Sequence, residues 1–281
     1  MGTDTHTGGR KPSEALLRTV VELTGDPGVD TREAGYRYAA RSGAPDDQIR
    51  LGAHLLEQGR LRDAATWLYR AAEQGSAMAM HNVAVLHIRM DDEEEAGEWY
   101  RRAAEHGYVP SMVAVGSWLL RSGSTQAEAE RWFVRAAEQG DVQGMFGAGV
   151  IAWTQGRAAD AERWLRPAAE QGDVEAMHPL GHLMEDAGRL PEAERWFHRA
   201  ADGGVAHAMN DLALILDRDG RLQEAERWYR GAAEKGVDAA DFALGDLLER
   251  TGRASEAALW FRRAADRGHA QARARAARLG G

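Results

Sequence analysis

The chain has 281 residues, a formal net charge of −9 and no cysteine. The acidic balance disfavours a nucleic-acid or anionic-membrane surface, because both require a basic face. The lack of cysteine excludes disulfides, thiolate metal sites and cysteine nucleophiles. No run reaches the roughly 20 apolar residues of a membrane span, and no signal-peptide core follows Met1. We therefore expect a cytoplasmic protein that binds neither nucleic acid nor membrane.

The N-terminal region divides into a tail and an atypical unit. Residues 1–12 are polar and glycine-rich, and we expect them to be disordered. Residues 13–43 then predict two helices that keep the phase of the later chain, because Ala39, Ala40 and Gly43 stand where later units carry Ala-Ala and glycine. The tryptophan of the later units is replaced by Gly35. We interpret residues 13–43 as a degenerate capping repeat.

A tryptophan recurs at almost constant spacing through the rest of the chain. The spacings are 32, 33, 32, 32, 32 and 32 residues, and a glycine follows eight residues after each tryptophan. The seven are Trp67, Trp99, Trp132, Trp164, Trp196, Trp228 and Trp260. A fixed period of about 32 residues predicts a solenoid, in which each unit packs on its neighbours.

Each unit predicts a pair of helices. In the unit after Gly204, Leu212 and Leu216 belong to an apolar stripe with helical spacing, and a glycine-containing turn ends that helix. Ala225 and Tyr229 then share one side of a second helix. We expect the tryptophans and the residues that follow them to fill the core, beside small residues that let the helices approach. The predicted fold is an all-α solenoid of antiparallel helix pairs, with seven pairs over residues 44–268 and a capping helix over residues 269–281.

This repeat resembles the tetratricopeptide family, and more closely its Sel-one-like relatives. Leu212, Ala213 and Leu216 match the leucine, small and large positions of a tetratricopeptide first helix. The residues from Ala193 to Gly204 reproduce the Sel-one-like run of alanine, tryptophan, aromatic residue, Ala-Ala and glycine. The resemblance covers about residues 31–280. It implies a right-handed superhelix and a scaffold or adaptor that binds a peptide or protein in a concave groove lined by the first helices.

Side chains of the first helices outside the core stripe are predicted to face this groove. They are Val85, Ile88, Val113, Leu120, Phe146, Val150, Trp153, His178, His182, Glu185, Asn210, Asp217, Phe242 and Asp246. The N-terminal part of this set is apolar, whereas the C-terminal part is acidic and rich in histidine. An apolar stripe with a polar rim favours a partner, here an amphipathic segment with one basic end. The alternatives are a homodimer, packing within the chain, and a regulator that responds to a bound peptide.

A pair of histidines could instead hold a metal ion. His178 and His182 are four residues apart, so they share one helix face, and His207 and Asp211 lie on the adjacent repeat. Zinc needs three or four converging ligands. Because Pro179, between the two histidines, is expected to distort the start of the helix, we interpret the pair as polar groove residues or pH-sensitive partner contacts. We therefore expect no metal and no cofactor, with a histidine metal site as the alternative.

Motifs of known chemistry do not occur in the sequence. There is no phosphate-binding glycine loop, no GxSxG, no HExxH and no dinucleotide fingerprint. The clamp that related repeats use for carboxylate-ended chaperone tails is also absent, since Ile49, Ala53, His81 and Val85 occupy its positions. The sequence therefore predicts a non-catalytic protein.

Overall fold

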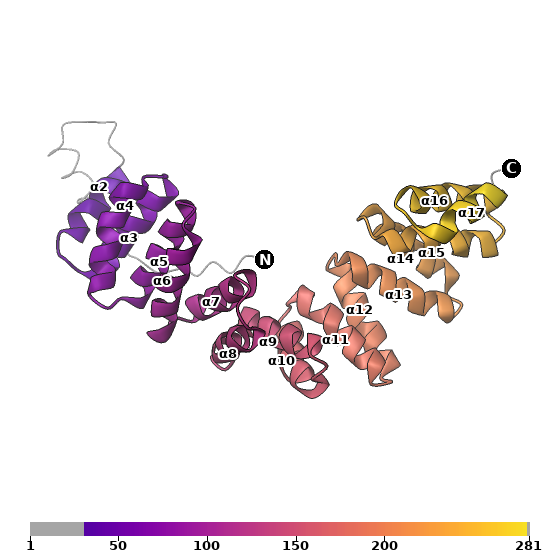
Figure 1. Ribbon diagram of the computed structural model, residues 1–281, viewed down its shortest axis with the longest axis horizontal. Coiled ribbons are helices and arrows are strands. Elements are labelled where there is room, and N and C mark those ends of the chain that lie inside the picture. Colours follow the sequence, from indigo (N-terminus) through magenta and orange to yellow (C-terminus); the bar gives the residue numbers. More distant parts are fainter. Residues whose placement is uncertain (1–30, 280–281) are drawn as a thin grey trace. The chain divides into compact units, whose positions relative to one another are not determined.

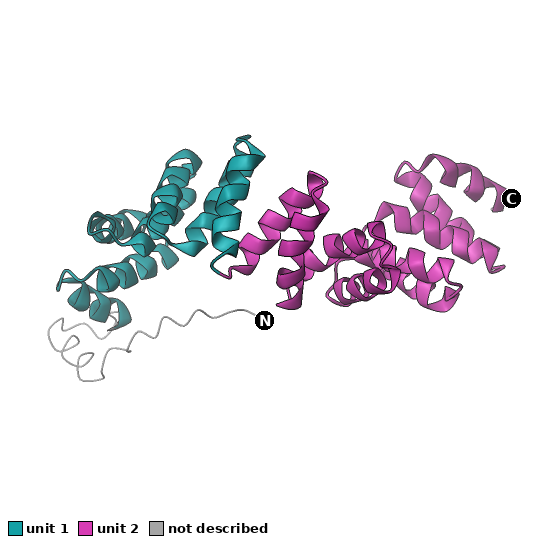
Figure 2. Cartoon of the chain, turned by 90° about the horizontal axis from the view of Figure 1, so that it is seen from below, with its two compact units in different colours: residues 1–139 teal, residues 140–281 magenta. Residues whose placement is uncertain are grey.

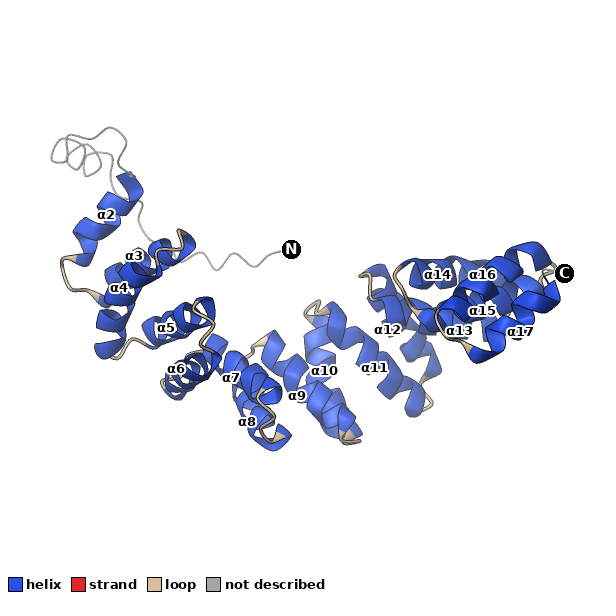
Figure 3. Cartoon of the chain, turned by 45° about the horizontal axis from the view of Figure 1, so that its top comes forward, coloured by secondary structure: helices blue, strands red, loops and turns tan. Residues whose placement is uncertain are grey.

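The computed structural model describes residues 31–279, and every regular element in that range is an α-helix (Figure 3). The predicted all-α solenoid of helix pairs is confirmed. The predicted tail of residues 1–12 and the first helix of the predicted capping repeat lie outside the described residues. No helix in the described range is both long enough and apolar enough to cross a membrane.

The helices alternate between two roles, which we name first and second helix of each repeat (Figure 1). The first helices are α3 (Pro45–Glu57), α5 (Ala77–Arg89), α7 (Val109–Arg121), α9 (Val142–Thr154), α11 (Val174–Asp186), α13 (Ala206–Arg218) and α15 (Asp238–Arg250). The second helices are α4 (Leu61–Glu73), α6 (Glu93–Glu105), α8 (Gln126–Ala137), α10 (Ala158–Glu170), α12 (Leu190–Asp202), α14 (Leu222–Glu234) and α16 (Ala254–Asp266). Two further helices flank the pairs, α2 (Thr31–Ala40) and α17 (Ala270–Leu279).

The chain forms two compact units, residues 1–139 and 140–281 (Figure 2). In unit 1, α3 packs against α4, α5 against α6 and α7 against α8. In unit 2, the pairs from α9 and α10 to α15 and α16 pack in the same way, and α17 packs against α16. Consecutive first helices also touch within a unit, as α3 does with α5 and α9 with α11. The first helices therefore form the more closely packed side of each unit.

The closest contact in a repeat joins a small residue of the first helix to a large residue of the second. A Cβ atom added to Gly181 would lie 2.6 Å from the ring of Phe197, and one added to Gly52 would lie 2.5 Å from Leu68. Gly116, Gly149 and Gly245 have the same relation to the next second helix. Only a small residue fits where the two helices meet, because a larger side chain would overlap a core residue. Glycine fills this place in five repeats, and Ala84 and Ala213 fill it in the other two.

The tryptophans do not all belong to the core, so that expectation is only partly right. Trp132 and Trp196 are buried, but the other five are partly exposed. An arginine guanidinium lies over each ring, for example that of Arg199 at 4.6 Å from the centre of Trp196. The fully enclosed residue is instead the next one in the chain, such as Phe197 or Tyr229. The Trp rings therefore form an outer layer beneath arginines, a geometry that cation–π attraction stabilises.

Ion pairs between arginine and glutamate connect successive second helices. Arg189, which precedes α12, lies 2.9 Å from Glu162 of α10 and 2.5 Å from Glu192 of its own helix. Arg253 repeats this arrangement with Glu226 at 2.6 Å and Glu256 at 2.7 Å. These pairs are partly exposed, so each contributes little to stability, but the repetition fixes how second helices stand beside one another.

The turn inside one repeat departs from the glycine pattern. Asp91 stands where Gly59 and Gly123 stand in their repeats, and its φ of 59° lies in the left-handed region that glycine favours. The next residue, Asp92, caps α6 by accepting a hydrogen bond from the Glu95 amide. The acidic run from Asp91 to Glu95 therefore forms this turn and the start of α6.

One buried position carries a charge in place of a methionine. Met80, Met112, Met145, Met177 and Met209 occupy equivalent buried sites in five first helices, and Asp241 occupies the sixth. Its side chain is fully buried, and neither carboxylate oxygen has a hydrogen-bond partner. Arg263 and Arg267 approach only to 3.3 and 3.4 Å. Burial raises the pKa of Asp241 above its ordinary value, which means that the folded state disfavours the carboxylate.

Gly181→Ala and Gly231→Ala should have opposite effects on stability, although both glycines lie inside helices. The first adds a methyl group against Phe197 and should destabilise the chain by about 1–3 kcal/mol. The second meets only the Met209 sulfur at 3.4 Å, so the better helix propensity of alanine should stabilise by about 1 kcal/mol. Urea unfolding followed by circular dichroism measures both. Equal midpoints for the two variants would contradict the assigned contact.

Asp241→Met should stabilise the protein by about 1–3 kcal/mol at neutral pH, because it replaces a buried carboxylate that lacks hydrogen-bond partners with the methionine of five other repeats. Arg263 and Arg267 keep partners at the Ala233 carbonyl and at Asp238. Since the folded pKa of Asp241 is raised, its cost is complete above that pKa and declines as the pH falls from the folded pKa to the lower unfolded pKa. The difference between the urea midpoints of the two proteins should therefore be smaller at mildly acidic pH than at neutral pH, and a constant difference would refute this assignment.

Candidate functional site

The predicted site residues lie on first helices of both units. We use the name first-helix face for the side chains of α5, α7, α9, α11, α13 and α15 that lie outside the core. In unit 1 it carries Ile88 and Leu120, which are exposed, and Val113, which is half-buried. The predicted groove residue Val85 is also half-buried, but it packs against the core. In unit 2, α9 contributes Phe146, Val150 and Trp153, all half-buried. The first-helix face in unit 2 also includes Leu214 of α13, which is 49% exposed.

Helix α11 places His178 and His182 on one face, as their spacing predicts. The helix runs without interruption from Val174 to Asp186, so the expectation that Pro179 distorts it is wrong. A proline here removes one backbone hydrogen bond but is accommodated near the helix start. The two imidazole rings stand edge to face with their centres 4.7 Å apart.

Asp211 of α13 completes a cluster with these histidines. Its Oδ2 atom lies 2.8 Å from Nε2 of His178 and 3.2 Å from Nε2 of His182. The two Nε2 atoms are themselves 3.2 Å apart. Three ligand atoms from two consecutive repeats thus form a triangle, which we call the His–His–Asp triad. The three side chains are neither fully buried nor fully exposed.

Neighbouring polar groups orient the triad. The Asn210 amide nitrogen lies 3.4 Å from Oδ1 of Asp211, while Glu185 lies 3.7 Å from Nδ1 of His182. Asn210 is only 8% exposed, so its predicted place on the surface is corrected, because its side chain turns toward Asp211 inside the helix pair. The hydrogen bond to Asp211 raises the pKa of His182 above its ordinary value, against the effect of burial. Burial disfavours the Asp211 carboxylate, but hydrogen bonds from both histidines outweigh it and lower its pKa.

Aromatic rings surround the triad and hold the imidazoles in place. Trp153 of α9 stacks on His182 with an interplanar angle of 9°, and the ring centres are 6.0 Å apart. Phe197 packs against both histidines from the core side. The exposed His207 of α13 stacks on His178 at 6.3 Å. Trp153, His178, His182 and Glu185 are therefore brought together in unit 2.

The other predicted acidic residues are neutralised within the chain. Asp217 of α13 lies 2.5 Å from Arg250 of α15, which also pairs with Asp246 at 2.9 Å. Asp246 is further paired with Arg275 of α17 at 3.0 Å. Phe242 stacks on His269, with ring centres 4.0 Å apart. All three residues join neighbouring helices. Because Asp217 and Asp246 are paired with arginines, this part of the face carries less unpaired negative charge than the sequence indicates.

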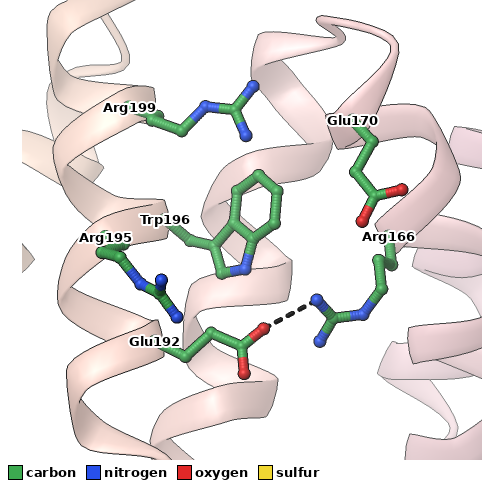
Figure 4. A pocket seen from close by; sticks show the side chains of 6 residues that line it. All are labelled: Arg166, Glu170, Glu192, Arg195, Trp196 and Arg199. Carbon is green, nitrogen blue, oxygen red and sulfur yellow. Dashed lines mark hydrogen bonds and ion pairs between the residues drawn. The ribbon is translucent and has the colours of Figure 1, made fainter.

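A pocket of about 330 Å³ lies elsewhere, between the second helices α10 and α12. Its lining includes Arg166, Arg195, Arg199, Glu192 and Trp196 (Figure 4). Arg166 donates a hydrogen bond to Glu192 at 2.7 Å, and Arg199 covers Trp196 while donating to the Ala169 carbonyl. The polar side chains of this pocket therefore belong to the arginine contacts that recur through the fold.

The sequence places Asp211 on the repeat next to the histidine pair, but Asp211 is not among the residues assigned to the groove. The relevant signal is its separation from His178, which is 33 residues, or one repeat plus one position. The same separation joins Asp217 to Arg250. In a helix-pair solenoid, residues one period apart on first helices are spatial neighbours, so this offset could have identified the third ligand.

Comparisons with known families identify the repeat. The Sel1 repeat model matches residues 45–76, 77–108, 111–141, 158–173, 176–205 and 241–269, which together exceed half of the chain. A tetratricopeptide repeat model matches residues 205–236. No curated protein matches the chain.

Solved structures agree with this assignment. The protective antigen c5321 of uropathogenic Escherichia coli, which displays an SLR fold, is 25% identical with a TM-score of 0.57, covering 94% of this chain and 70% of that one. A Sel1 repeat protein from Oxalobacter formigenes is 22% identical with a TM-score of 0.63, covering 77% of this chain and 96% of that one. The phase of the helix pairs, the family models and these folds coincide, and the chain therefore belongs to the Sel1 repeat family.

Proposed function

We propose that the chain is a non-catalytic scaffold that binds a protein or peptide segment on its first-helix face. The observation that carries the proposal is the apolar surface that this face exposes on the closely packed side of the helices. Leu120 of α7 is 42% exposed, and Ile88 of α5 is exposed as well. The core residues of the same two helices, such as Leu86 and Leu119, are by contrast buried. Apolar side chains that remain at the surface beside a complete core are suited to a partner.

The preferred partner is an amphipathic segment whose apolar side chains meet α5 and α7 of unit 1. A basic end on this partner, which the acidic residues of the sequence suggest, has less support, because Asp217 and Asp246 already pair with arginines of this chain. An amphipathic helix or extended peptide presents such apolar side chains at regular intervals. The second helices are less suited, because their surface is organised by repeated arginine–glutamate pairs.

A matched pair of leucine substitutions tests which face binds. Leu120 lies on a first helix and Leu259 on the second helix α16, and both are exposed, Leu259 to 61%. Peptides selected from a displayed random library on the full chain should bind Leu120→Asp at least about tenfold more weakly, as expected when a contact at the centre of an interface is lost. Leu259→Asp should bind like the original chain. Circular dichroism checks that both variants are folded.

Equal binding to Leu120→Asp, or equal loss with Leu259→Asp, would contradict the proposal that peptides bind the first-helix face.

Self-association gives a different result. If the face joins two copies of the chain, light scattering should show a dimer that Leu120→Asp converts to a monomer, with no selected peptide competing for the surface. That result would replace the proposed scaffold function with a homodimer.

A further inference from the structure

The His–His–Asp triad cannot be explained fully by hydrogen bonds. Its three edges, of 2.8, 3.2 and 3.2 Å, all lie within hydrogen-bonding distance. Each Nε2 atom carries at most one proton, and an ionised carboxylate carries none. If both nitrogens donate to Asp211, two N–H groups face one another along the third edge. If one imidazole donates to the other, the acceptor nitrogen faces the carboxylate oxygen without a proton. One edge is thus unfavourable in every protonation state with an ionised Asp211.

A metal ion satisfies all three atoms at once, because each offers it a lone pair. Zinc binds imidazole nitrogen and carboxylate oxygen at about 2.0–2.2 Å, which places tetrahedral ligand atoms about 3.3 Å apart. Octahedral ligands at the same bond length stand about 2.9 Å apart. The two edges of 3.2 Å lie between these values, and the edge of 2.8 Å is slightly shorter than the octahedral one.

The groups around the triad also fit a metal site. Ligating histidines commonly offer their other ring nitrogen to a carboxylate, and Nδ1 of His182 faces Glu185 at 3.7 Å. Ligating carboxylates are held by hydrogen bonds, and Oδ1 of Asp211 faces the amide of Asn210. Trp153 and Phe197 fix the rings and provide an apolar surround. Apart from this triad, the described residues contain no other convergent group of three His, Asp or Glu ligand atoms.

We propose that His178, His182 and Asp211 bind one divalent transition-metal ion of the Zn²⁺ class. The ion joins α11 to α13 and so fastens two consecutive repeats. Three protein ligands leave a fourth position for water or for a side chain of a bound partner. This site is independent of the proposed peptide surface on α5 and α7, so either can fail without the other.

Calorimetric titration of the chelator-treated, untagged full chain with Zn²⁺ tests the proposal. We expect one Zn²⁺ per chain, and an affinity at least about 100-fold lower in His182→Ala and Asp211→Asn, because each removes a ligand. Mg²⁺, which prefers oxygen ligands, should give no binding. His198→Ala is the matched control: His198 pairs with Asp202 at 2.9 Å on α12, outside the triad, and its loss should leave zinc affinity unchanged.

A second readout separates binding from folding. Zn²⁺ should raise the unfolding temperature of the original chain and of His198→Ala, but not that of Asp211→Asn. Unchanged zinc affinity in both triad variants, equal loss in His198→Ala, or no zinc binding by a chain with a native helical spectrum would each overturn the proposal.

Discussion

The structure depends on the contact between a small residue of each first helix and a large residue of the second helix that follows. At Gly181 the space for a Cβ atom is already taken by the Phe197 ring, and Gly52 and Leu68 show the same exclusion. This contact sets the distance and rotation of the two helices, because neither can turn without overlap. Once one side of each first helix is packed on its second helix, the opposite side must face outward. The repeated core in this way sets the position of outward side chains that differ from repeat to repeat.

Departures from the repeat then separate into two kinds. Some are structural adjustments, such as Asp91 in a glycine turn or Asp241 in a methionine site. Others, such as the triad, gather polar atoms from consecutive first helices in an arrangement that the core does not need. Phe197 connects the two levels, because it packs beneath Gly181 and also against the imidazoles of His178 and His182. The core therefore holds the three triad atoms in position, which would reduce the cost of ordering them when a ligand binds.

The sequence predicts the helix pairs because their signals are local and repeated: the stripe around Leu212, the turn at Gly220 and the phase of the tryptophans. It overestimates the burial of those tryptophans. Five of them are partly exposed and lie in an outer layer beneath arginine side chains, which the repeat pattern does not indicate. It also indicates that His178 and His182 share a face. What it leaves open depends on side-chain directions between repeats, including the turn of Asn210 inward and the approach of Asp211 to both histidines. The acidic character near Asp217 is similarly misjudged, since its arginine partner lies one repeat away.

The central claim is that side chains outside the repeat pattern, carried by consecutive first helices, form a binding site. Anomalous diffraction at the zinc edge from crystals of the chain grown with Zn²⁺ tests it most directly. The account predicts one strong peak about 2.0–2.2 Å from Nε2 of His178, Nε2 of His182 and a carboxylate oxygen of Asp211. A map with no peak at these three atoms, or with zinc only at other histidines such as His198, would contradict it.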